Sequence, residues 1–181
     1  GILIRDARSL ELSHKVNIVL LDKTGTLTEG APKVVESYFC PEGKSELSYV
    51  NAIENQASHP FAKAISQYTK TLLGIDSLNF HVEEIQNVPG MGCFGVVNGK
   101  KVVVGSRSWL ESQGMNTVVD WLPHGEIEKI KANGKSRVWA SVDQHLTCVL
   151  ILDDQLRSEA KQAILALQKE AQVKILSGDN A

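Results

Sequence analysis

The chain has 181 residues, and its 19 basic and 21 acidic side chains give a net charge of −2 with the histidines neutral. Hydrophobic residues make up 43% and charged residues 22%, which is ordinary for a globular protein and excludes a disordered chain. The charge balance lacks the basic excess of nucleic-acid-binding proteins, so no nucleic-acid partner is expected. This length predicts one domain or two small ones.

The sequence gives no sign of a membrane span or a targeting segment. No stretch approaches the roughly 18 consecutive apolar residues that cross a bilayer. The chain begins with Gly1 rather than Met, which is typical of a piece of a longer protein. The three cysteines are widely spaced without a C-x-x-C pair, so each is interpreted as a small core residue: Cys40, Cys93 and Cys148.

The first element expected in the chain is a strand over residues 16–21, an almost continuous apolar run typical of a strand buried on both faces in a parallel sheet. A second strand of this kind is predicted at 173–176, after a helix that Ser158 caps. Both strands end on polar, glycine-containing loops. Because ligands bind at the carboxyl ends of such strands, both ends of the chain are predicted to build one α/β domain.

The middle of the chain has a different pattern. In order, we expect a strand, two helices, a hairpin, a helix and a second hairpin, at residues 34–39, 45–57, 60–72, 94–104, 126–132 and 137–152. The hairpin turns are predicted at Asn98-Gly99 and Asp143-Gln144. These elements indicate an antiparallel α+β domain inserted into the α/β domain, with hinges near 30–32 and 153–154.

The strongest chemical signal is Asp-Lys-Thr-Gly-Thr-Leu-Thr at 22–28, directly after the first strand. A carboxylate there offers a nucleophile beside backbone N–H groups and hydroxyls, an arrangement suited to phosphoryl transfer. A plain Asx-turn would need only the Asp and the Gly, and would leave Lys23, Thr24 and Thr26 unexplained.

Residues 90–95 match the dinucleotide fingerprint G-x-G-x-x-G, but the context excludes a Rossmann fold. That fingerprint requires a helix directly after it, whereas a strand and a hairpin are expected here. The glycines remain candidates for close approach of the backbone to a ligand. Another candidate is His59, which in isolation is interpreted as a capping or surface residue.

The loop at 22–28 resembles the phosphorylation loop of P-type ATPases, a branch of the haloacid-dehalogenase-like superfamily. The resemblance implies that Asp22 accepts the γ-phosphate of ATP, that Asp22 and the carbonyl of Thr24 hold Mg²⁺, and that Lys23 and Thr26 belong to the catalytic loop. Phosphatase relatives carry a second Asp at the Thr24 position. Because a neutral hydroxyl is a poor general base, Thr24 favours a long-lived acyl phosphate and an ion pump.

Ser-His-Pro at 58–60, with a Glu five residues before the His, resembles the nucleotide-binding domain of heavy-metal-transporting P-type ATPases. The ATP pocket implied by this resemblance consists of Glu54, His59, Gly90, Gly92, Gly105 and Ser106. In the family an Asn usually follows the glycine at 105, and Ser106 keeps a hydrogen-bonding group with shorter reach.

Two further matches extend the resemblance to the end of the chain. Asp154–Arg157 resembles the D-x-x-R segment that re-enters the phosphorylation domain, although a solvated helix start explains Arg157 equally well. Ser-Gly-Asp-Asn at 177–180 resembles the family's T-G-D-N, which implies that Ser177 binds the transferred phosphoryl group and that Asp179 is catalytic. The family's catalytic Lys and its G-D-G-x-N-D segment are missing, so this polypeptide alone is expected to bind nucleotide but turn it over poorly.

We therefore expect an α/β fold: a partial haloacid-dehalogenase-like phosphorylation domain at 1–32 and 153–181, with an inserted antiparallel α+β nucleotide-binding domain at 33–152. The implied function is ATP binding and phosphorylation, with ATP and Mg²⁺, in the cytoplasmic part of an integral membrane heavy-metal pump whose transmembrane helices are the partner. Copper is the first expectation for the ion, and zinc, cadmium and cobalt are alternatives. Two other functions stay open: a soluble phosphohydrolase with residues 33–149 as cap, and a non-catalytic nucleotide-binding module.

Overall fold

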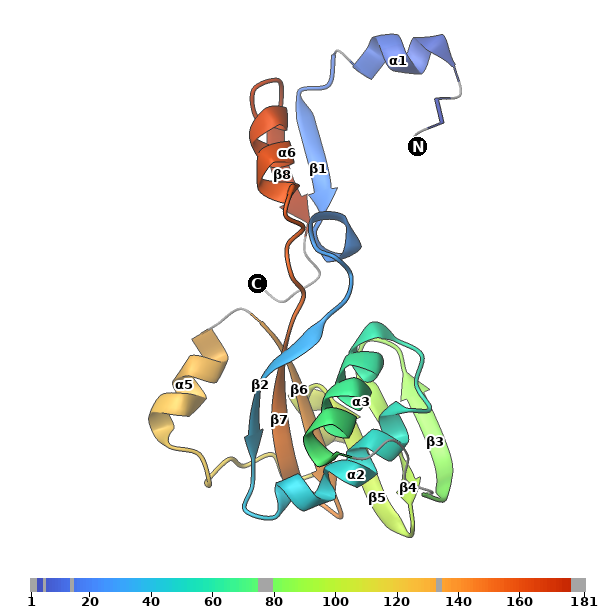
Figure 1. Cartoon of the computed structure of the whole chain (residues 1–181), viewed down its shortest axis with the longest axis vertical. Coiled ribbons are helices and arrows are strands. Elements are labelled where there is room, and N and C mark those ends of the chain that lie inside the picture. The colour runs from blue at the N-terminus through green and yellow to red at the C-terminus, as the bar shows by residue number, and fades with distance from the viewer. Residues whose placement is uncertain (1–2, 5, 14, 75–79, 133–134, 177–181) are drawn as a thin grey trace. The chain divides into compact units, whose positions relative to one another are not determined.

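The computed structural model describes the chain except for residues 1–2, 5, 14, 75–79, 133–134 and 177–181 (Figure 1). The chain divides into two compact units, and the strands of each unit form a sheet of their own. Unit 1 comprises residues 1–31 and 154–181, and unit 2 comprises residues 32–153. In the part of the chain that the structure describes, no helix is both long and apolar enough to cross a membrane.

Unit 1 is built around a two-stranded parallel sheet. Strand β1 (Ile18–Asp22) pairs with β8 (Gln172–Leu176) in a register that puts Asp22 opposite Leu176. Helix α1 (Ala7–Ser13) precedes β1, and helix α6 (Ala160–Leu167) precedes β8. The parallel pairing predicted from the two apolar runs is confirmed, and the carboxyl ends of both strands therefore lie at the same edge.

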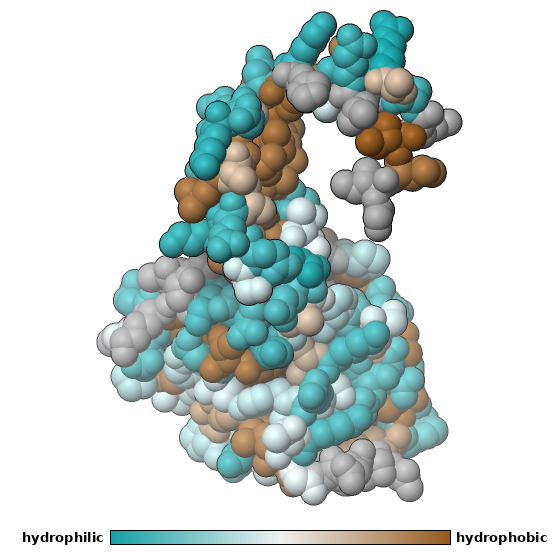
Figure 2. Space-filling view, turned by 45° about the horizontal axis from the view of Figure 1, so that its top comes forward, coloured by the Kyte–Doolittle hydropathy of each residue, from teal (hydrophilic) through white to brown (hydrophobic). Residues whose placement is uncertain are grey.

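The expectation that these two strands are buried on both faces is wrong. Large apolar side chains remain about half exposed, with 46% exposure for Ile18, 56% for Leu20 and 53% for Ile175. Figure 2 shows the resulting hydrophobic surface on unit 1. The physical reason is that two strands packed against one short helix lack the second layer that buries a central parallel strand.

Unit 2 contains a six-stranded antiparallel sheet in the order β2-β7-β6-β5-β4-β3. Its strands are β2 (Lys33–Phe39), β3 (Val82–Val88), β4 (Gly92–Val97), β5 (Lys100–Gly105), β6 (Ser136–Val142) and β7 (His145–Asp153). Its helices are α2 (Gly43–Glu54), α3 (Pro60–Leu73), α4 (Arg107–Ser112) and α5 (His124–Ala132). This agrees with the antiparallel α+β architecture expected for the middle of the chain.

Each face of the six-stranded sheet has its own hydrophobic core. Alternate residues of a strand point to opposite faces, so Val102 and Val104 pack with α2 and α3 while Val103 packs with α4 and α5. Helices α2 and α3 cover one face of the sheet (Figure 1), and Leu47 of α2 and Ile65 of α3 are fully buried in the first core. The sheet is therefore a central layer packed on both faces, and the loops at its edges extend from it.

Several helix boundaries differ from those expected. Ser158 does not cap α6; Glu159 holds the N-cap position, and the Ser158 hydroxyl donates to the Glu159 carboxylate over 2.7 Å. Helix α2 begins at Gly43 rather than Ser45, because a turn from Gly43 N–H to the carbonyl of Cys40 starts it earlier. Three elements were not predicted at all: α1, β3 and α4.

Candidate nucleotide-binding and phosphorylation sites

Asp22 is the last residue of β1 and its side chain is exposed at the carboxyl edge of the sheet in unit 1. The irregular turn η1 (Lys23–Leu27) follows directly, with Thr24 extended and Gly25 at a φ of +76°. Only glycine adopts this backbone without strain, so Gly25 gives the loop its shape. Thr24 and Thr26 are exposed beside Asp22, and Lys23 is half-buried.

Thr28 follows this loop directly and holds it by hydrogen bonds, and its side chain is only 1% exposed. Its hydroxyl oxygen accepts a hydrogen bond from the N–H of Gly25 (2.9 Å) and donates to Oδ2 of Asp154 (2.5 Å). Its backbone N–H donates to the carbonyl of Lys23 over 3.1 Å. The exposed carboxylate of Asp22 therefore stands at the start of a loop whose backbone is fixed by hydrogen bonds.

The segment at 154–157 also makes hydrogen bonds that hold the backbone of the loop after Asp22. Oδ1 of Asp154 accepts from the N–H of Ala31 (3.1 Å), and Nη2 of Arg157 donates to the carbonyl of Gly25 (3.2 Å). The N–H of Arg157 also donates to the carbonyl of Leu27 over 2.9 Å. Asp154 and Arg157 thus contact the loop itself, and the D-x-x-R match was the only sequence signal for these positioning residues.

The oxygen atoms at this loop are suited to Mg²⁺. Mg²⁺ takes one or two carboxylates, keeps several waters, and prefers hard oxygen donors, which the Asp22 carboxylate and the Thr24 carbonyl supply. In the described ranges, no three His, Cys, Asp or Glu side chains gather in a group that could hold a metal ion. The donor set therefore fits a partly hydrated ion rather than a closed protein cage. Ser177 and Asp179, predicted for the same edge, lie outside the described residues.

Glu54, predicted for the ATP pocket, is the last residue of α2 in unit 2 and is only 2% exposed. Its Oε1 accepts a hydrogen bond from Sγ of Cys93 on β4 at 3.7 Å. Its Oε2 is buried without a hydrogen-bond partner among the described residues. Burial raises the pKa of Glu54 to about 7, and the Cys93 hydrogen bond opposes that rise.

Gly92 and Gly105 are direct partners across the β4–β5 ladder. A Cβ on Gly92 would lie 2.1 Å from the carbonyl oxygen of Val104, and one on Gly105 would lie 2.3 Å from that of Met91. The N–H of Ser106 donates to the carbonyl of Met91 over 2.9 Å. The backbones of β4 and β5 therefore approach each other closely at these glycines, and the approach of a ligand to the Gly-x-Gly loop stays a prediction.

The structure brings four of the six predicted ATP residues together. Gly92 adjoins Cys93, which contacts Glu54, and Gly92 also pairs with Gly105, which precedes Ser106. Ser106 additionally caps α4, since its Oγ accepts from the N–H of Trp109 over 3.2 Å. Gly90 lies in the turn before β4 at a φ of +76°.

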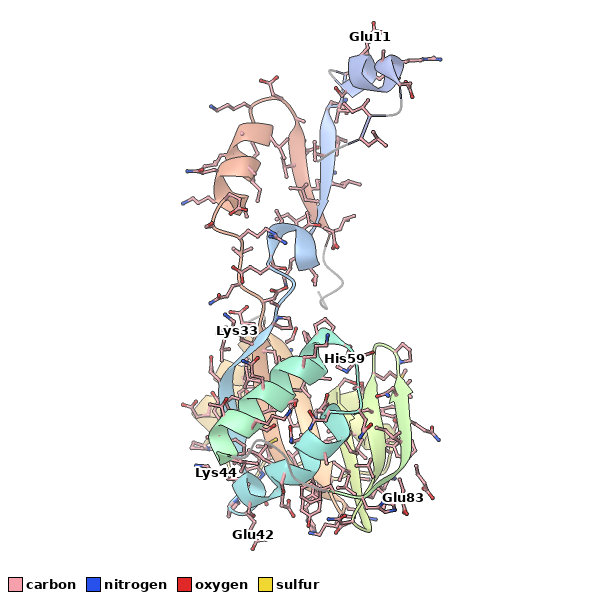
Figure 3. The ribbon with its side chains drawn as sticks, turned by 45° about the vertical axis from the view of Figure 1, so that its right-hand side comes forward. Glu11, Lys33, Glu42, Lys44, His59 and Glu83 are labelled. Atoms are coloured by element: carbon pink, nitrogen blue, oxygen red, sulfur yellow. The ribbon has the colours of Figure 1, made fainter. Side chains whose placement is uncertain are left out.

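His59 is the N-cap of α3, where Figure 3 labels it at the beginning of the helix. Its Nδ1 accepts from the N–H of Ala62 over 3.2 Å, so the neutral ring carries its proton on Nε2. Burial lowers the pKa of His59, which favours this neutral form. The ring thus serves as a cap, and within the described part of the chain its Nε2–H has no acceptor, so it can donate to a ligand.

Trp109 is a residue of this site that the sequence analysis missed. Its Cδ1 lies 2.7 Å from a Cβ built on Gly92 and 2.8 Å from one built on Gly105, so the indole covers both glycines. Its Nε1 is buried without a hydrogen-bond partner among the described residues. The short helix α4 that carries it gave no periodic signal from which the contact could have been predicted.

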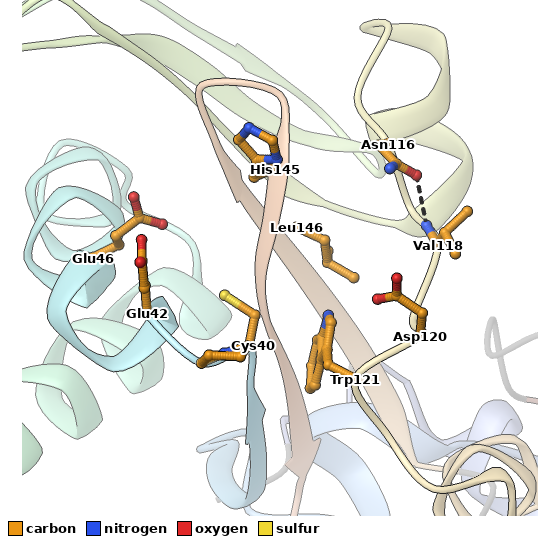
Figure 4. Close-up of a pocket in the computed structure, with 10 residues that line it drawn as sticks. Cys40, Glu42, Glu46, Asn116, Val118, Asp120, Trp121, His145 and Leu146 are labelled. Carbon is orange, nitrogen blue, oxygen red and sulfur yellow. Dashed lines mark hydrogen bonds between the residues drawn. The ribbon is translucent and has the colours of Figure 1, made fainter.

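The structure also contains a cleft of about 430 Å³ that none of the predicted ATP residues lines (Figure 4). Its lining includes Glu42, Trp121 and His145. Glu42 and Glu46, at the beginning of α2, line the cleft, whereas Glu54 ends that helix, so the lining lies about 12–18 Å from Glu54 along the helix axis at 1.5 Å per residue. This cleft is distinct from the predicted nucleotide pocket.

Ionisation of Glu54 is expected to make the stability of unit 2 depend on pH. Its pKa is about 7 in the folded chain against an ordinary 4.5, so the folded state binds more protons between those values. The free energy of unfolding should therefore fall by about 3 kcal/mol as the pH rises through this window, and level off above it. Urea unfolding at intervals from pH 4.5 to 8 measures the slope.

The matched variants for this measurement are Glu54→Gln and Glu42→Gln. Glu54→Gln should remove the fall in stability because an amide does not titrate. Glu42→Gln, at the exposed opposite end of α2, should retain it. The expectation would be contradicted if the free energy of unfolding fell equally with rising pH in the wild type and in Glu54→Gln.

Residues 16–181 match the haloacid dehalogenase-like hydrolase family, and the chain therefore belongs to that family. Within it, the chain is 34% identical over 184 residues to Copper-exporting P-type ATPase B of Archaeoglobus fulgidus, covering 99% of this chain and 25% of the relative. It is 33% identical to Cadmium/zinc-transporting ATPase HMA2 of Arabidopsis thaliana, covering 99% of this chain and 19% of the relative. The chain thus spans a quarter or less of the length of these relatives.

The fold is similar to that of the catalytic domain of the CPx-ATPase CopB-B, solved in work on its conformational changes upon nucleotide binding. The TM-score is 0.71 at 23% identity, covering 99% of this chain and 60% of the other. The family match and this similarity of fold together confirm the expected combination of a haloacid-dehalogenase-like α/β fragment and an inserted antiparallel α+β domain.

Proposed function

We propose that this chain is the ATP-binding and phosphorylation region of a heavy-metal-transporting P-type ATPase, in which Asp22 forms an aspartyl phosphate. The observation that carries the proposal is the exposed Asp22 carboxylate at the carboxyl end of a parallel strand. The loop that follows it is held in place by the hydrogen bond between Thr28 and Asp154. The region would be a cytoplasmic part of an integral membrane protein and act on its transmembrane helices.

The chemistry assigned to Asp22 is nucleophilic attack on the γ-phosphorus of ATP. A carboxylate oxygen forms the new O–P bond while the bond to the bridging oxygen breaks, and ADP leaves with that electron pair. Lys23 supplies positive charge, and the Thr26 hydroxyl supplies a hydrogen bond. Mg²⁺, held by Asp22 and the Thr24 carbonyl, would offset the charge of the phosphate oxygens. Thr24 provides no general base, so the acyl phosphate persists.

ATP is assigned to unit 2, in the pocket formed by Glu54, His59, the Gly90–Gly92 loop, Gly105 and Ser106. Among the described residues, the buried Oε2 of Glu54 has no donor and Nε2 of His59 has no acceptor, so the pocket offers complementary groups to a nucleotide. The soluble phosphohydrolase is the weaker alternative, because it requires an acid or base where Thr24 stands.

His59→Ala is expected to weaken ATP binding about tenfold, which corresponds to the loss of one hydrogen bond of about 1.4 kcal/mol. Calorimetric titration of this chain with ATP measures the change. His59→Asn keeps a capping side chain, so it separates the loss of the cap from the loss of the Nε2–H contact.

The matched control is His145→Ala, which alters the separate cleft instead. We expect its affinity for ATP to equal that of the wild type. Undiminished binding by His59→Ala together with weakened binding by His145→Ala would move ATP into that cleft. If no protein binds ATP, small phosphate esters become the ligands to test, as the phosphohydrolase alternative predicts.

Copper is proposed as the transported ion, with zinc, cadmium and cobalt as alternatives. The relatives bear names of both kinds, copper for one and cadmium/zinc for another. Ion-stimulated ATP hydrolysis by the full-length pump, measured with each metal in turn, would identify the ion.

A further inference from the structure

Among the residues that the structure describes, Cys93 is the cysteine that contacts a predicted ligand-binding residue, Glu54. It lies on β4 directly after Gly92, and its side chain is 1% exposed. Its thiol donates to Oε1 of Glu54 over 3.7 Å, whereas Oε2 has no partner among the described residues. The two oxygens of this carboxylate therefore differ in their hydrogen bonds. Oε1 accepts one from the protein, whereas Oε2 can accept one from a ligand.

The thiol acts as a donor throughout the physiological pH range. Burial first, and the neighbouring Glu54 carboxyl second, raise the pKa of Cys93, so the sulfur keeps its proton. The pKa of Glu54 is raised by burial and lowered by the hydrogen bond from Cys93. The thiol therefore stabilises the ionised carboxylate, the form in which both oxygens accept hydrogen bonds.

We propose that Cys93 is a positioning residue of the nucleotide pocket: by holding Oε1 of Glu54, it directs Oε2 toward an amino group of the base. The inference rests on the proposed function, which assigns Glu54 to the ATP pocket. An unpartnered carboxylate oxygen accepts from a donor, and the exocyclic amine of the ATP base, which the proposed function places here, supplies one. Since Oε2 is buried, the side chains that cover it move when the base enters.

The test uses variants that separate the donor from the packing. Cys93→Val removes the donor at similar volume, and Cys93→Ser keeps a donor. Cys148→Val makes the same change at a fully buried cysteine of the same core that does not contact Glu54. If Cys93→Val fails to fold, Cys93→Ala replaces it, because a smaller side chain cannot overpack the site.

The first measurement is the affinity for ATP by calorimetry at pH 7 and at pH 8.5. Near pH 7, Cys93→Val should bind roughly three- to tenfold more weakly, the effect of one weak hydrogen bond. The loss should shrink at pH 8.5, where Glu54 is ionised with or without the thiol. Cys93→Ser and Cys148→Val should bind within about twofold of the wild type. A loss in Cys93→Ser as large as that in Cys93→Val indicates packing alone, and wild-type affinity in Cys93→Val shows that the thiol positions nothing; either result overturns the inference.

The second measurement needs no nucleotide, so it distinguishes this inference from the proposed function. NMR titration of the Glu54 side-chain carboxyl carbon in the free protein should give a higher pKa in Cys93→Val than in the wild type, and no change in Cys148→Val. Identical titration of Glu54 in all three proteins overturns the role of Cys93. Failure of the wild type to bind ATP, whatever the titration gives, overturns the proposed function and with it the inference.

Discussion

Asp22→Asn is expected to abolish the phosphorylated intermediate completely. The amide has nearly the size of the carboxylate but lacks a nucleophilic oxygen, so no O–P bond forms with the γ-phosphorus. The hydrogen bonds that shape the loop involve Gly25, Thr28 and Asp154 and do not include the Asp22 side chain, so its fold should persist. The measurement is acid-stable incorporation of radiolabelled phosphate from ATP into the full-length pump.

The control for this experiment is Asp120→Asn, an equal change at an exposed carboxylate that lines the separate cleft. It should be phosphorylated to the level of the wild type. Phosphorylation of Asp22→Asn at that level would refute the assignment of the nucleophile. An unphosphorylated wild type that still binds ATP would favour the non-catalytic nucleotide-binding module.

Gly92→Ala is expected to destabilise unit 2 by about 2–4 kcal/mol, the cost of forcing a side chain into a filled space. The new Cβ would lie 2.1 Å from the carbonyl oxygen of Val104 and 2.7 Å from Cα of Gly105. Both neighbours are backbone atoms of a paired strand, so relief requires that the β4–β5 ladder shift. Denaturant unfolding measures the loss, and ATP affinity should fall with it because the predicted pocket is built on this ladder.

Gly125→Ala is the matched control, since no atom lies within 4 Å of a Cβ at this position in α5. Alanine is the better helix former, so this variant should equal the wild type or exceed it by up to about 1 kcal/mol. A stability of Gly92→Ala as high as that of Gly125→Ala would show that the ladder tolerates the methyl group.

Local chemistry made several features predictable from the sequence. The turn at Asn98-Gly99 places both residues at positive φ, 48° and 79°, which these two residue types tolerate best. The turn at Asp143-Gln144 has the same backbone, with φ values of 47° and 70°. The parallel pairing of β1 with β8 followed from their apolar runs, because such strands need a partner of the same kind.

Other features depended on packing and could not be predicted. Strand β3 is an edge strand with a register shift between Glu83 and Gln86, so its sequence shows no alternation. The contact between Glu54 and Cys93 joins residues 39 apart, and that between Thr28 and Asp154 joins residues 126 apart. No spacing rule in the sequence relates such positions. The exposure of β1 and β8 likewise depends on which layers cover them rather than on their own residues.

The pairing of Lys33 with Asp153 means that the first residue of β2 and the last residue of β7, at the two ends of the six-stranded domain, are immediate neighbours. A domain whose two ends are adjacent can be inserted at a single point of the host domain, as a surface loop can. During evolution, such a domain can be acquired, lengthened or exchanged without rerouting the polypeptide that carries Asp22. The strand that carries Asp22 and the six-stranded sheet can therefore diversify independently of each other.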